Sequence, residues 1–325
     1  MKKLSPIAAA VVRGCGALVV PRSTLLVLIF HRVLPQRDAL LWDEPDVDEF
    51  AAQMDILRAT CNVLPLSEAL QRLQRSALPP RAACITFDDG YANNLTHAAP
   101  VLRKRGLPAT VFVATGYLGG GRMWNDTVIE SVRNAEGELD LSALGLGRFE
   151  LPDTAARRRA IESILTELKY WPPHERLAKS LEIAARVGKD LCPDLMLTES
   201  QVGELARQGV EIGAHTVTHP ILARVDAETA KREICASKAA LEAIVSGPVR
   251  LFAYPNGRPG RDYEREHVEM VRNAGFDAAV STAWGAAHRN SDLFQIPRMT
   301  PWERTPLRYA ARLLYTYRQT RVALA

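Results

Sequence analysis

Hydrophobic positions along the chain fall into two kinds of segment. Short apolar runs rich in β-branched residues occur at residues 25–30, 82–87, 109–114, 210–214, 250–254 and 277–281. Most of them are apolar along nearly their whole length, which is typical of strands that are covered on both faces in a parallel sheet. We therefore expect six buried strands.

Segments with apolar residues at helical spacing lie between these runs, at residues 46–60, 66–76, 97–106 and 198–209. Thr198 and Gln201 have the spacing of a capping box, and Gly106 and Gly209 suit helix ends. Alternation of strands and helices predicts an α/β protein, either a β/α barrel or a doubly wound sheet.

One connection, residues 115–209, is too long for a simple crossover. Within it, residues 139–152 predict a hairpin, and residues 154–171 and 175–188 predict helices. We expect an N-terminal helix at 1–24, a barrel at 25–300 with a largely helical insertion at about 125–197, and a basic amphipathic helix at 301–325.

Composition excludes several classes of protein. An apolar fraction of 47% with 24% charged residues is ordinary for a globular chain. The net charge is only +4 and no block of like charge occurs, so we expect no nucleic-acid binding. The five cysteines are scattered and form neither a zinc knuckle nor a disulfide framework. Arg13 interrupts the first apolar run, which predicts a helix rather than a signal peptide.

The C-terminal segment carries Arg308, Arg312, Arg318 and Arg321 among apolar residues. Such a helix can rest on an anionic membrane surface as a peripheral contact, or it can pack against the body of the protein. We favour packing. No apolar run reaches the roughly 20 residues that a membrane span needs.

Polar residues follow four of the predicted strands. His31 follows the first, Asp88 and Asp89 the second, His215 the fourth, and Asn256 lies just beyond the fifth. Functional residues of β/α barrels lie at the C-terminal ends of the strands. We therefore expect these side chains to converge on one pocket.

The adjacent carboxylates of Asp88 and Asp89 allow two interpretations. Asp-Gly is a common turn dipeptide at strand ends. Alternatively, one carboxylate binds a cation while the other stays free as a base, because two ionised neighbours repel unless a positive charge lies between them.

His215 and His219 are four residues apart, a separation at which two imidazoles reach one metal ion. Pro220 disfavours a helix at His219, so we place His219 in a loop. A histidine pair alone is more often structural, but with an aspartate from another strand end it forms a two-histidine, one-carboxylate set suited to zinc or another divalent ion.

These residues together resemble the polysaccharide deacetylases of carbohydrate esterase family 4, metal-dependent enzymes that remove acetyl groups from N-acetylated sugars. The resemblance covers about residues 25–300 and implies a distorted (β/α) barrel of seven or eight strands. "TFDDG" corresponds to the first motif of the family, which makes Asp88 the base and Asp89 a metal ligand. "HTVTH" corresponds to the second motif, with His215 and His219 as ligands.

"FAYPNG" is similar to the third motif, which forms one wall of the substrate groove. By this resemblance Tyr254, Pro255 and Asn256 contact substrate, and Tyr91 lies beside the reacting carbonyl, where a backbone N–H stabilises the oxyanion. Trp124 either stacks on a sugar ring or belongs to the core.

The sequence departs from the family at two places. Ala253 stands where most members carry the arginine that orients the base, and Arg298 or Arg250 are the candidate replacements. No histidine follows His288, so the late Leu-x-His motif is missing. "LIFHRVLP" is similar to the permuted element of a subgroup that deacetylates biofilm poly-N-acetylglucosamine, which makes His31 the candidate acid; the alternative is a histidine that only forms a local hydrogen bond.

The resemblance implies metal-dependent hydrolysis of the acetamide of an N-acetylated sugar, in a polysaccharide or its lipid-linked precursor, during exopolysaccharide or cell-envelope glycan biosynthesis. It implies one divalent ion, with zinc expected first and Co, Ni or Mn as alternatives. We expect a cytoplasmic protein at the membrane surface, with the periplasm as the alternative. An amidase or imidase acting on a small non-sugar amide, or a non-catalytic sugar-binding relative, are the competing hypotheses.

Four other histidines have no partner motif and are expected at the surface: His97, His174, His267 and His288.

Overall fold

The computed structural model describes residue 14 and residues 20–325. The predicted N-terminal helix at 1–24 therefore lies largely outside the described residues. The first strand of the described chain is β1 (Thr24–Phe30).

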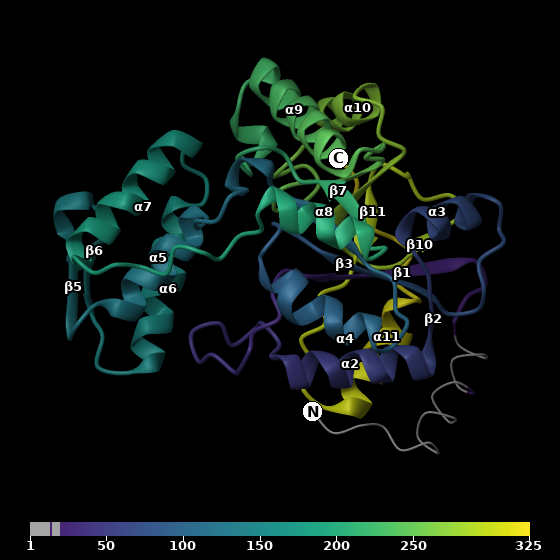
Figure 1. Cartoon of the computed structure of the whole chain (residues 1–325), viewed down its shortest axis with the longest axis horizontal. Coiled ribbons are helices and arrows are strands. Elements are labelled where there is room, and N and C mark those ends of the chain that lie inside the picture. Colours follow the sequence, from purple (N-terminus) through teal and green to yellow (C-terminus); the bar gives the residue numbers. More distant parts are fainter. Residues whose placement is uncertain (1–13, 15–19) are drawn as a thin grey trace.

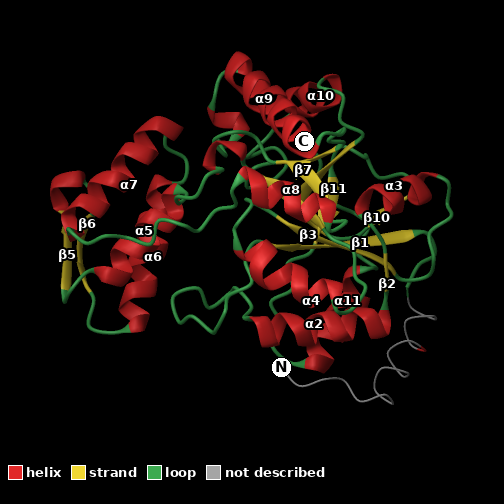
Figure 2. Cartoon of the chain, viewed as in Figure 1, coloured by secondary structure: helices red, strands yellow, loops and turns green. Residues whose placement is uncertain are grey.

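A nine-stranded sheet forms the centre of the molecule, in the order β10-β1-β3-β4-β7-β8-β9-β11 with β2 paired to β3 (Figures 1 and 2). Its strands after β1 are β2 (Asn62–Val63), β3 (Ala82–Phe87), β4 (Thr110–Val113), β7 (Glu211–Ala214), β8 (Leu251–Ala253), β9 (Ala278–Trp284), β10 (Ala287–His288) and β11 (Ile296–Arg298). All six predicted strands are present. β2, β10 and β11 were not predicted, because two or three residues carry no recognisable pattern.

The sheet closes into a barrel. β1, β3, β4, β7, β8, β9 and β11 are parallel neighbours in that order. Met299, directly after β11, forms a parallel bridge to Leu28 of β1, with hydrogen bonds of 2.8 and 3.0 Å. These seven parallel strands confirm the predicted distorted (β/α) barrel.

Both faces of the strands are buried, which explains their continuous apolar sequences. Leu25 and Val27 of β1 pack inside with Cys84 of β3 and Ile296 of β11. Their neighbours, such as Leu28, face the opposite side and pack under the surrounding helices. Alternate residues of one strand thus pack in two apolar regions, the interior of the barrel and the layer between the strands and the helices.

Helices surround the barrel: α2 (Val47–Thr60), α3 (Leu66–Gln74), α4 (Ala99–Arg103), α8 (Glu199–Arg207), α9 (Ala227–Val245) and α10 (Arg265–Asn273). The capping box of α8 is confirmed, since the Gln201 N–H donates to Thr198 Oγ1 over 3.2 Å and the Thr198 N–H donates to Gln201 Oε1 over 2.9 Å. α9, the longest of them, was not predicted.

Most of the segment between β4 and α8 forms a separate lobe beside the barrel (Figure 1). It contains α5 (Trp124–Asn134), the antiparallel strands β5 (Glu138–Leu141) and β6 (Gly147–Glu150), α6 (Thr154–Leu168) and α7 (Pro173–Val187). The predicted hairpin and both predicted helices are present. The lobe has its own hydrophobic cluster, which includes Val128, Leu139 and Ile164. We call residues 124–187 the insertion.

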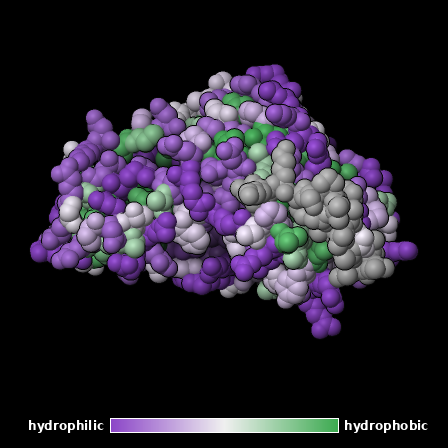
Figure 3. Space-filling model, turned by 90° about the horizontal axis from the view of Figure 1, so that it is seen from below, coloured by the Kyte–Doolittle hydropathy of each residue, from purple (hydrophilic) through white to green (hydrophobic). Residues whose placement is uncertain are grey.

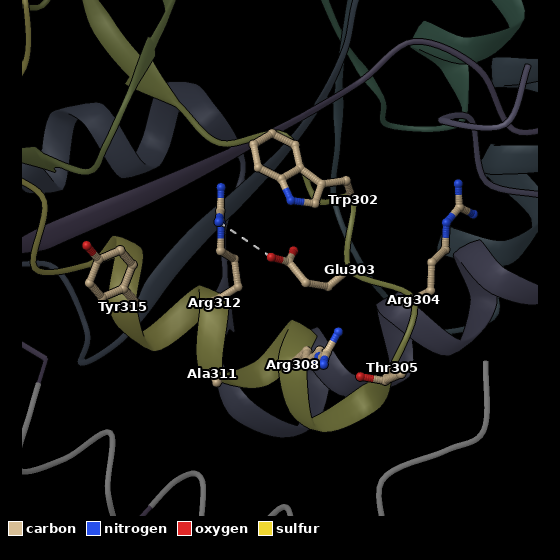
Figure 4. A pocket seen from close by; sticks show the side chains of 8 residues that line it. All are labelled: Trp302, Glu303, Arg304, Thr305, Arg308, Ala311, Arg312 and Tyr315. Atoms are coloured by element: carbon tan, nitrogen blue, oxygen red, sulfur yellow. Dashed lines mark ion pairs between the residues drawn. The ribbon is translucent and has the colours of Figure 1, made fainter. Parts of the chain in front are cut away.

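The C-terminal helix α11 (Pro306–Thr316) packs against the body, burying Tyr309, Ala310 and Leu313. Its outer side borders an open hollow of about 550 Å³, where Arg312 lies 4.3 Å from the Trp302 ring and 3.5 Å from Glu303 (Figure 4). The face of the molecule seen in Figure 3 is mostly hydrophilic, with hydrophobic side chains in small separate groups. Among the described helices, none is long and apolar enough to cross a membrane.

Candidate metal centre

Asp89, His215 and His219 meet at the C-terminal end of the barrel. Asp89 Oδ1 is 3.5 Å from His215 Nε2 and 3.4 Å from His219 Nε2, and the three donor atoms all lie within 4.8 Å of one another. Two ligands about 2.1 Å from one ion in tetrahedral geometry are about 3.4 Å apart. The donor set therefore fits a divalent cation in both chemistry and spacing.

The backbone takes unusual conformations at each of the three motifs. Asp89, Thr216, His219 and Asn256 all have positive φ, between 54° and 74°. Such conformations cost energy for residues other than glycine and persist where the surrounding structure imposes them. Gly90 has φ of 86°, and a Cβ there would lie 3.1 Å from Val113, so the glycine of "DDG" lets the turn approach β4.

His215 is oriented by the third motif. Its Nδ1 is 2.7 Å from the Ala253 carbonyl oxygen, so Nδ1 carries the proton and Nε2 is free as a ligand toward Asp89. The position where the sequence lacks the expected arginine thus contributes a backbone carbonyl to the site.

The loop between the two histidines is held by a residue that sequence reasoning missed. Glu233 of α9 accepts hydrogen bonds from the N–H groups of Val217 and Thr218, at 2.7 and 2.8 Å, and from Thr218 Oγ1 at 2.7 Å. The His219 N–H donates to Thr216 Oγ1 over 3.1 Å. No sequence motif identifies Glu233, because it reaches the loop from a helix that was not predicted.

His219 is neutral at ordinary pH. Burial lowers the pKa of His219 to about 3, and the negative charge of Asp89, which acts to raise it, does not compensate. Its Nδ1 is buried without a hydrogen-bond partner among the described residues. Neutral imidazole is the form that binds metal.

Asp88 has a different partner. Arg298, at the end of β11, donates from Nη1 to Oδ1 and from Nη2 to Oδ2 of Asp88, both over 2.7 Å, and both side chains are almost fully buried. Burial acts to raise the pKa of Asp88, but the charges and hydrogen bonds of Arg298, with His215, outweigh it and lower the pKa. Asp88 is therefore ionised and held in one orientation.

Of the two arginines considered as replacements at Ala253, the structure brings only Arg298 to Asp88. Arg250 precedes β8, is about half exposed, and pairs with Asp277 over 3.1 Å. It therefore lies at the opposite end of the barrel.

His31 follows β1 and lies beside the first motif, because β1 pairs with β3 and the Asp88 N–H donates to the Phe30 carbonyl over 2.9 Å. Asn94 Nδ2 donates to the His31 carbonyl over 2.9 Å and fixes the backbone. Burial acts to lower the pKa of His31, but the carboxylates of Asp89, Glu44 and Asp88 raise it more. The cationic form of His31 is favoured.

Glu44 is a second residue that sequence reasoning missed. It accepts a hydrogen bond from the Arg32 N–H over 3.2 Å, which holds it next to the strand end that carries His31. Burial raises the pKa of Glu44 to about 7, against the opposing effect of the positive charge on His31. Glu44 and His31 each favour the charged form of the other at the edge of the site.

Tyr91, expected to bind substrate, does not present its side chain to the site. The ring is buried, its hydroxyl donates to Asp126 over 3.1 Å, and the Arg32 guanidinium lies 4.8 Å from its centroid. The Tyr91 N–H, in contrast, donates no hydrogen bond to any part of the chain that the structure describes. The backbone, not the ring, is thus available to a ligand.

Tyr254 also requires correction. It is fully buried, its ring stacks on Tyr263 at 3.8 Å, and its hydroxyl donates to the Phe294 carbonyl over 3.0 Å. Pro255 is buried as well, whereas Asn256 is half-buried and its contact with substrate stays a prediction. A motif position does not reveal which way a side chain points.

Trp124 begins α5 and belongs to the hydrophobic cluster of the insertion, with 8% of its surface exposed. The guanidinium of Arg176 covers its ring at 4.7 Å. This placement supports the core interpretation rather than stacking on a sugar.

His267 is not at the surface, contrary to expectation. It is buried, and its Nδ1 accepts a hydrogen bond from the Glu264 N–H over 3.0 Å at the start of α10. Its role is that of a helix cap.

Comparisons with known proteins identify the family of this chain. A putative polysaccharide deacetylase of Bacillus subtilis, YxkH, is 22% identical over 77% of this chain and 63% of its own length. The poly-beta-1,6-N-acetyl-D-glucosamine N-deacetylase of Staphylococcus epidermidis is 30% identical over 32% of this chain and 40% of its own length. The chain thus spans less than two thirds of the length of either curated relative.

Solved structures show the same fold. The Streptococcus pyogenes deacetylase PplD, solved with acetate, superimposes with a TM-score of 0.59 at 19% identity, covering 90% of this chain and 98% of PplD. IcaB from Ammonifex degensii gives a TM-score of 0.56 at 21% identity, covering 90% and 97%. The model of the polysaccharide deacetylase family matches residues 75–279. This chain belongs to the polysaccharide deacetylase family.

Proposed function

We propose that this protein is a metal-dependent N-deacetylase that hydrolyses the acetamide of an N-acetylated sugar and releases acetate. One observation supports this most directly. Two adjacent carboxylates have separate partners, since Asp89 faces two histidine nitrogens at 3.4 and 3.5 Å while Asp88 is held by Arg298 through two bonds of 2.7 Å. The adjacent residues Asp88 and Asp89 can therefore serve as a free base and as a metal ligand, respectively.

Asp89, His215 and His219 would hold the divalent ion. When bound, the ion supplies a Lewis acid that polarises the acetyl carbonyl and lowers the pKa of a water molecule. Asp88, ionised and kept out of the ligand set by Arg298, accepts the proton of the attacking water. Its lowered pKa keeps this base active down to acidic pH.

The leaving amine must receive a proton, because an amide anion is a very poor leaving group. His31 is the group at this end of the barrel whose surroundings favour the cation, and we assign it the role of acid. The unbonded Tyr91 N–H is suited to stabilise the oxyanion that forms as water adds. His31 and Arg298 both lie outside residues 75–279, so their roles rest on the geometry of this chain.

For the substrate, we propose an N-acetylated glycan or its lipid-linked precursor, in exopolysaccharide or cell-envelope biosynthesis. The Staphylococcus epidermidis relative is described as acting on poly-beta-1,6-N-acetyl-D-glucosamine. A half-buried His31 at the end of the first strand agrees with the permuted position of the acid in that subgroup.

The direct test is acetate release by zinc-loaded protein from oligomers of β-1,6-linked and β-1,4-linked N-acetylglucosamine. We expect release that stops after treatment with a chelator and returns when zinc is added. A small N-acylated amine without a sugar serves as the comparison substrate. Release from this amine alone would contradict the glycan assignment and indicate an amidase.

A further inference from the structure

A buried arginine without an acidic partner lies beside the candidate metal centre. Arg176, on α7 of the insertion, is 3% exposed. Its Nη1 donates to the Lys169 carbonyl over 3.1 Å and its Nη2 to the His219 carbonyl over 3.4 Å, while its Nε has no partner among the described residues. Arg176 is thus hydrogen-bonded to the backbone carbonyl of His219, one of the proposed metal ligands.

Arg176 contacts the backbone of Lys169, and three further cations lie around Lys169 and Tyr170: Arg224, Arg258 and Arg261. Three of these cations surround the ring of Tyr170, with Lys169 Nζ at 5.7 Å, Arg224 at 5.3 Å and Arg261 at 4.7 Å from its centroid. Tyr170 in turn donates to Asp262 over 3.4 Å, and Asp262 accepts the Arg258 N–H over 3.1 Å. We call these five cations, Arg176 included, the cationic cluster.

The cluster joins the insertion to the catalytic end of the barrel. Lys169 and Arg176 come from the insertion, whereas Arg224 follows the "HTVTH" motif and Arg258 and Arg261 follow "PNG". Figure 1 shows the insertion beside the barrel. The contacts at Tyr170 and at His219 place the cluster where these two parts meet.

Charge in the cluster is unbalanced. The buried carboxylate of Asp262 lies among the five cations and favours the charged form of Lys169, but it forms no ion pair with any of them within the described chain. Burial, in contrast, lowers the pKa of Lys169 and of Arg176. The chain as a whole is nearly balanced, with 41 basic and 37 acidic residues, so general basicity does not explain the cluster.

An uncompensated buried charge costs several kcal/mol, and this cost applies to Arg176, whereas Lys169 is half-buried and the other three cations are exposed. Like charges gathered in one place also repel. A bound anion removes both penalties. Guanidinium groups form paired hydrogen bonds to phosphate oxygens, which makes arginine the common choice for that group. The cluster therefore has the chemistry of an anion site that is completed by its ligand.

We infer that the cationic cluster is a substrate subsite for a diphosphate ester, and that the N-acetylated sugar is carried on that diphosphate. The inference rests on the proposed function. In a sugar 1-diphosphate the acetamide at C2 and the ester at C1 are on adjacent carbons. Arg176 donates a hydrogen bond to the His219 carbonyl, which places this end of the cluster beside the candidate metal centre, where the acetamide would react.

The test compares substrates that differ in the diphosphate. Acetate release is measured from di-N-acetylchitobiose, which is neutral, from uridine diphosphate N-acetylglucosamine, and from undecaprenyl diphosphate N-acetylglucosamine. The variant is Arg224→Ala with Arg261→Ala, because both side chains are exposed and their loss leaves the fold intact. Arg103→Ala, an exposed arginine at the end of α4 on the opposite side of the barrel, is the control for one lost charge.

We expect the double variant to raise KM for a diphosphate substrate by about tenfold or more, with a much smaller change for chitobiose. A larger effect on the nucleotide or on the lipid identifies the source of the diphosphate, and either one supports the subsite. Equal changes for the neutral and the charged substrates, or no change, would overturn it.

A binding measurement separates failure of this inference from failure of the proposed function. Uridine diphosphate N-acetylglucosamine is titrated calorimetrically into zinc-loaded Asp88→Asn protein, with and without the two arginine substitutions. If no substrate releases acetate from wild-type protein, the proposed function fails, yet arginine-dependent binding still supports the anion site. Binding that does not depend on the arginines would contradict it.

Discussion

The metal centre and the cationic cluster lie at the same end of the barrel but differ in how their charges are matched. In the candidate metal centre the charge of Asp88 is paired with Arg298, and Asp89 faces the ring nitrogens of the two histidines. In the cluster, five cations accompany one buried carboxylate, Asp262, and none of the five forms an ion pair within the described residues. The side chains of the candidate metal centre are suited to bind one cation, whereas those of the cationic cluster are suited to bind an anion.

This difference separates chemistry from substrate selection. The matched charges fix a base, a ligand set and an acid for a reaction that any acetamide can undergo. The unmatched charges add nothing to that reaction and instead select what the sugar is attached to. Substitutions in the two regions should therefore change different kinetic constants.

The largest effect is expected for Asp88→Asn. Loss of the base should lower kcat by about a thousandfold, within the range for a general base, while zinc content stays at the wild-type value. Acetate release and elemental analysis of the same sample check this. Asp89→Asn is the matched control and should lose the metal. A kcat within tenfold of wild type in Asp88→Asn would remove Asp88 from the role of base.

Arg298→Lys should have the next largest effect. Lysine keeps the charge but cannot form the two parallel bonds to Asp88, so kcat should fall about tenfold to a hundredfold. Arg250→Lys is the control, because its exposed pair with Asp277 contributes little to stability. If both variants lost activity equally, the orienting role of Arg298 would be wrong.

Glu44→Gln should move the pH profile. The acid must be protonated, so activity is lost as pH rises through the pKa of His31, which Glu44 helps to raise. Removing the carboxylate lowers that pKa and should shift the basic limb of kcat/KM to lower pH by about one unit. Glu44→Asp should restore most of the shift. A limb that stays in place would exclude Glu44 as the partner of His31.

The smallest effect is expected for Arg176→Met. Methionine can still cover the Trp124 ring but carries no charge, so the free energy of unfolding of zinc-loaded protein without glycan should rise by about 1 kcal/mol. Urea denaturation measures this. A fall in the free energy of unfolding of about 2 kcal/mol or more would mean that the two carbonyl contacts of Arg176 stabilise the fold. The charge of Arg176 would then not destabilise the protein without its ligand.

Much of the fold could be predicted from the sequence, because buried parallel strands are long apolar runs bounded by polar residues. The six short apolar runs predicted as strands are strands of the barrel, and the hairpin and two helices of the insertion were equally recognisable. β11 escaped notice because three residues have no periodicity, although its pairing closes the barrel. α9 is rich in alanine and charged residues, which leaves it without a clear apolar face in the sequence.

The residues of the site also fall into two groups, those that lie in recognisable motifs and those that no local pattern marks. The proposed ligands and the proposed base lie in short motifs whose residue types and spacing indicate this chemistry, so they could be named as candidates from the sequence. Glu233, Glu44 and Arg176 act through contacts between segments that are distant in sequence, and no local pattern marks them. Tyr254 shows the converse error, since its motif is recognisable but its ring points into the core.

The central claim is that Asp89, His215 and His219 hold one divalent ion. Metal content measured by elemental analysis tests it most directly, on protein purified without a metal-affinity tag, loaded with zinc and desalted, with His219→Ala treated in parallel. The account predicts one zinc per chain in wild type and its loss in a folded His219→Ala variant. Well-folded wild-type protein without zinc, or a variant that keeps it, would contradict the account.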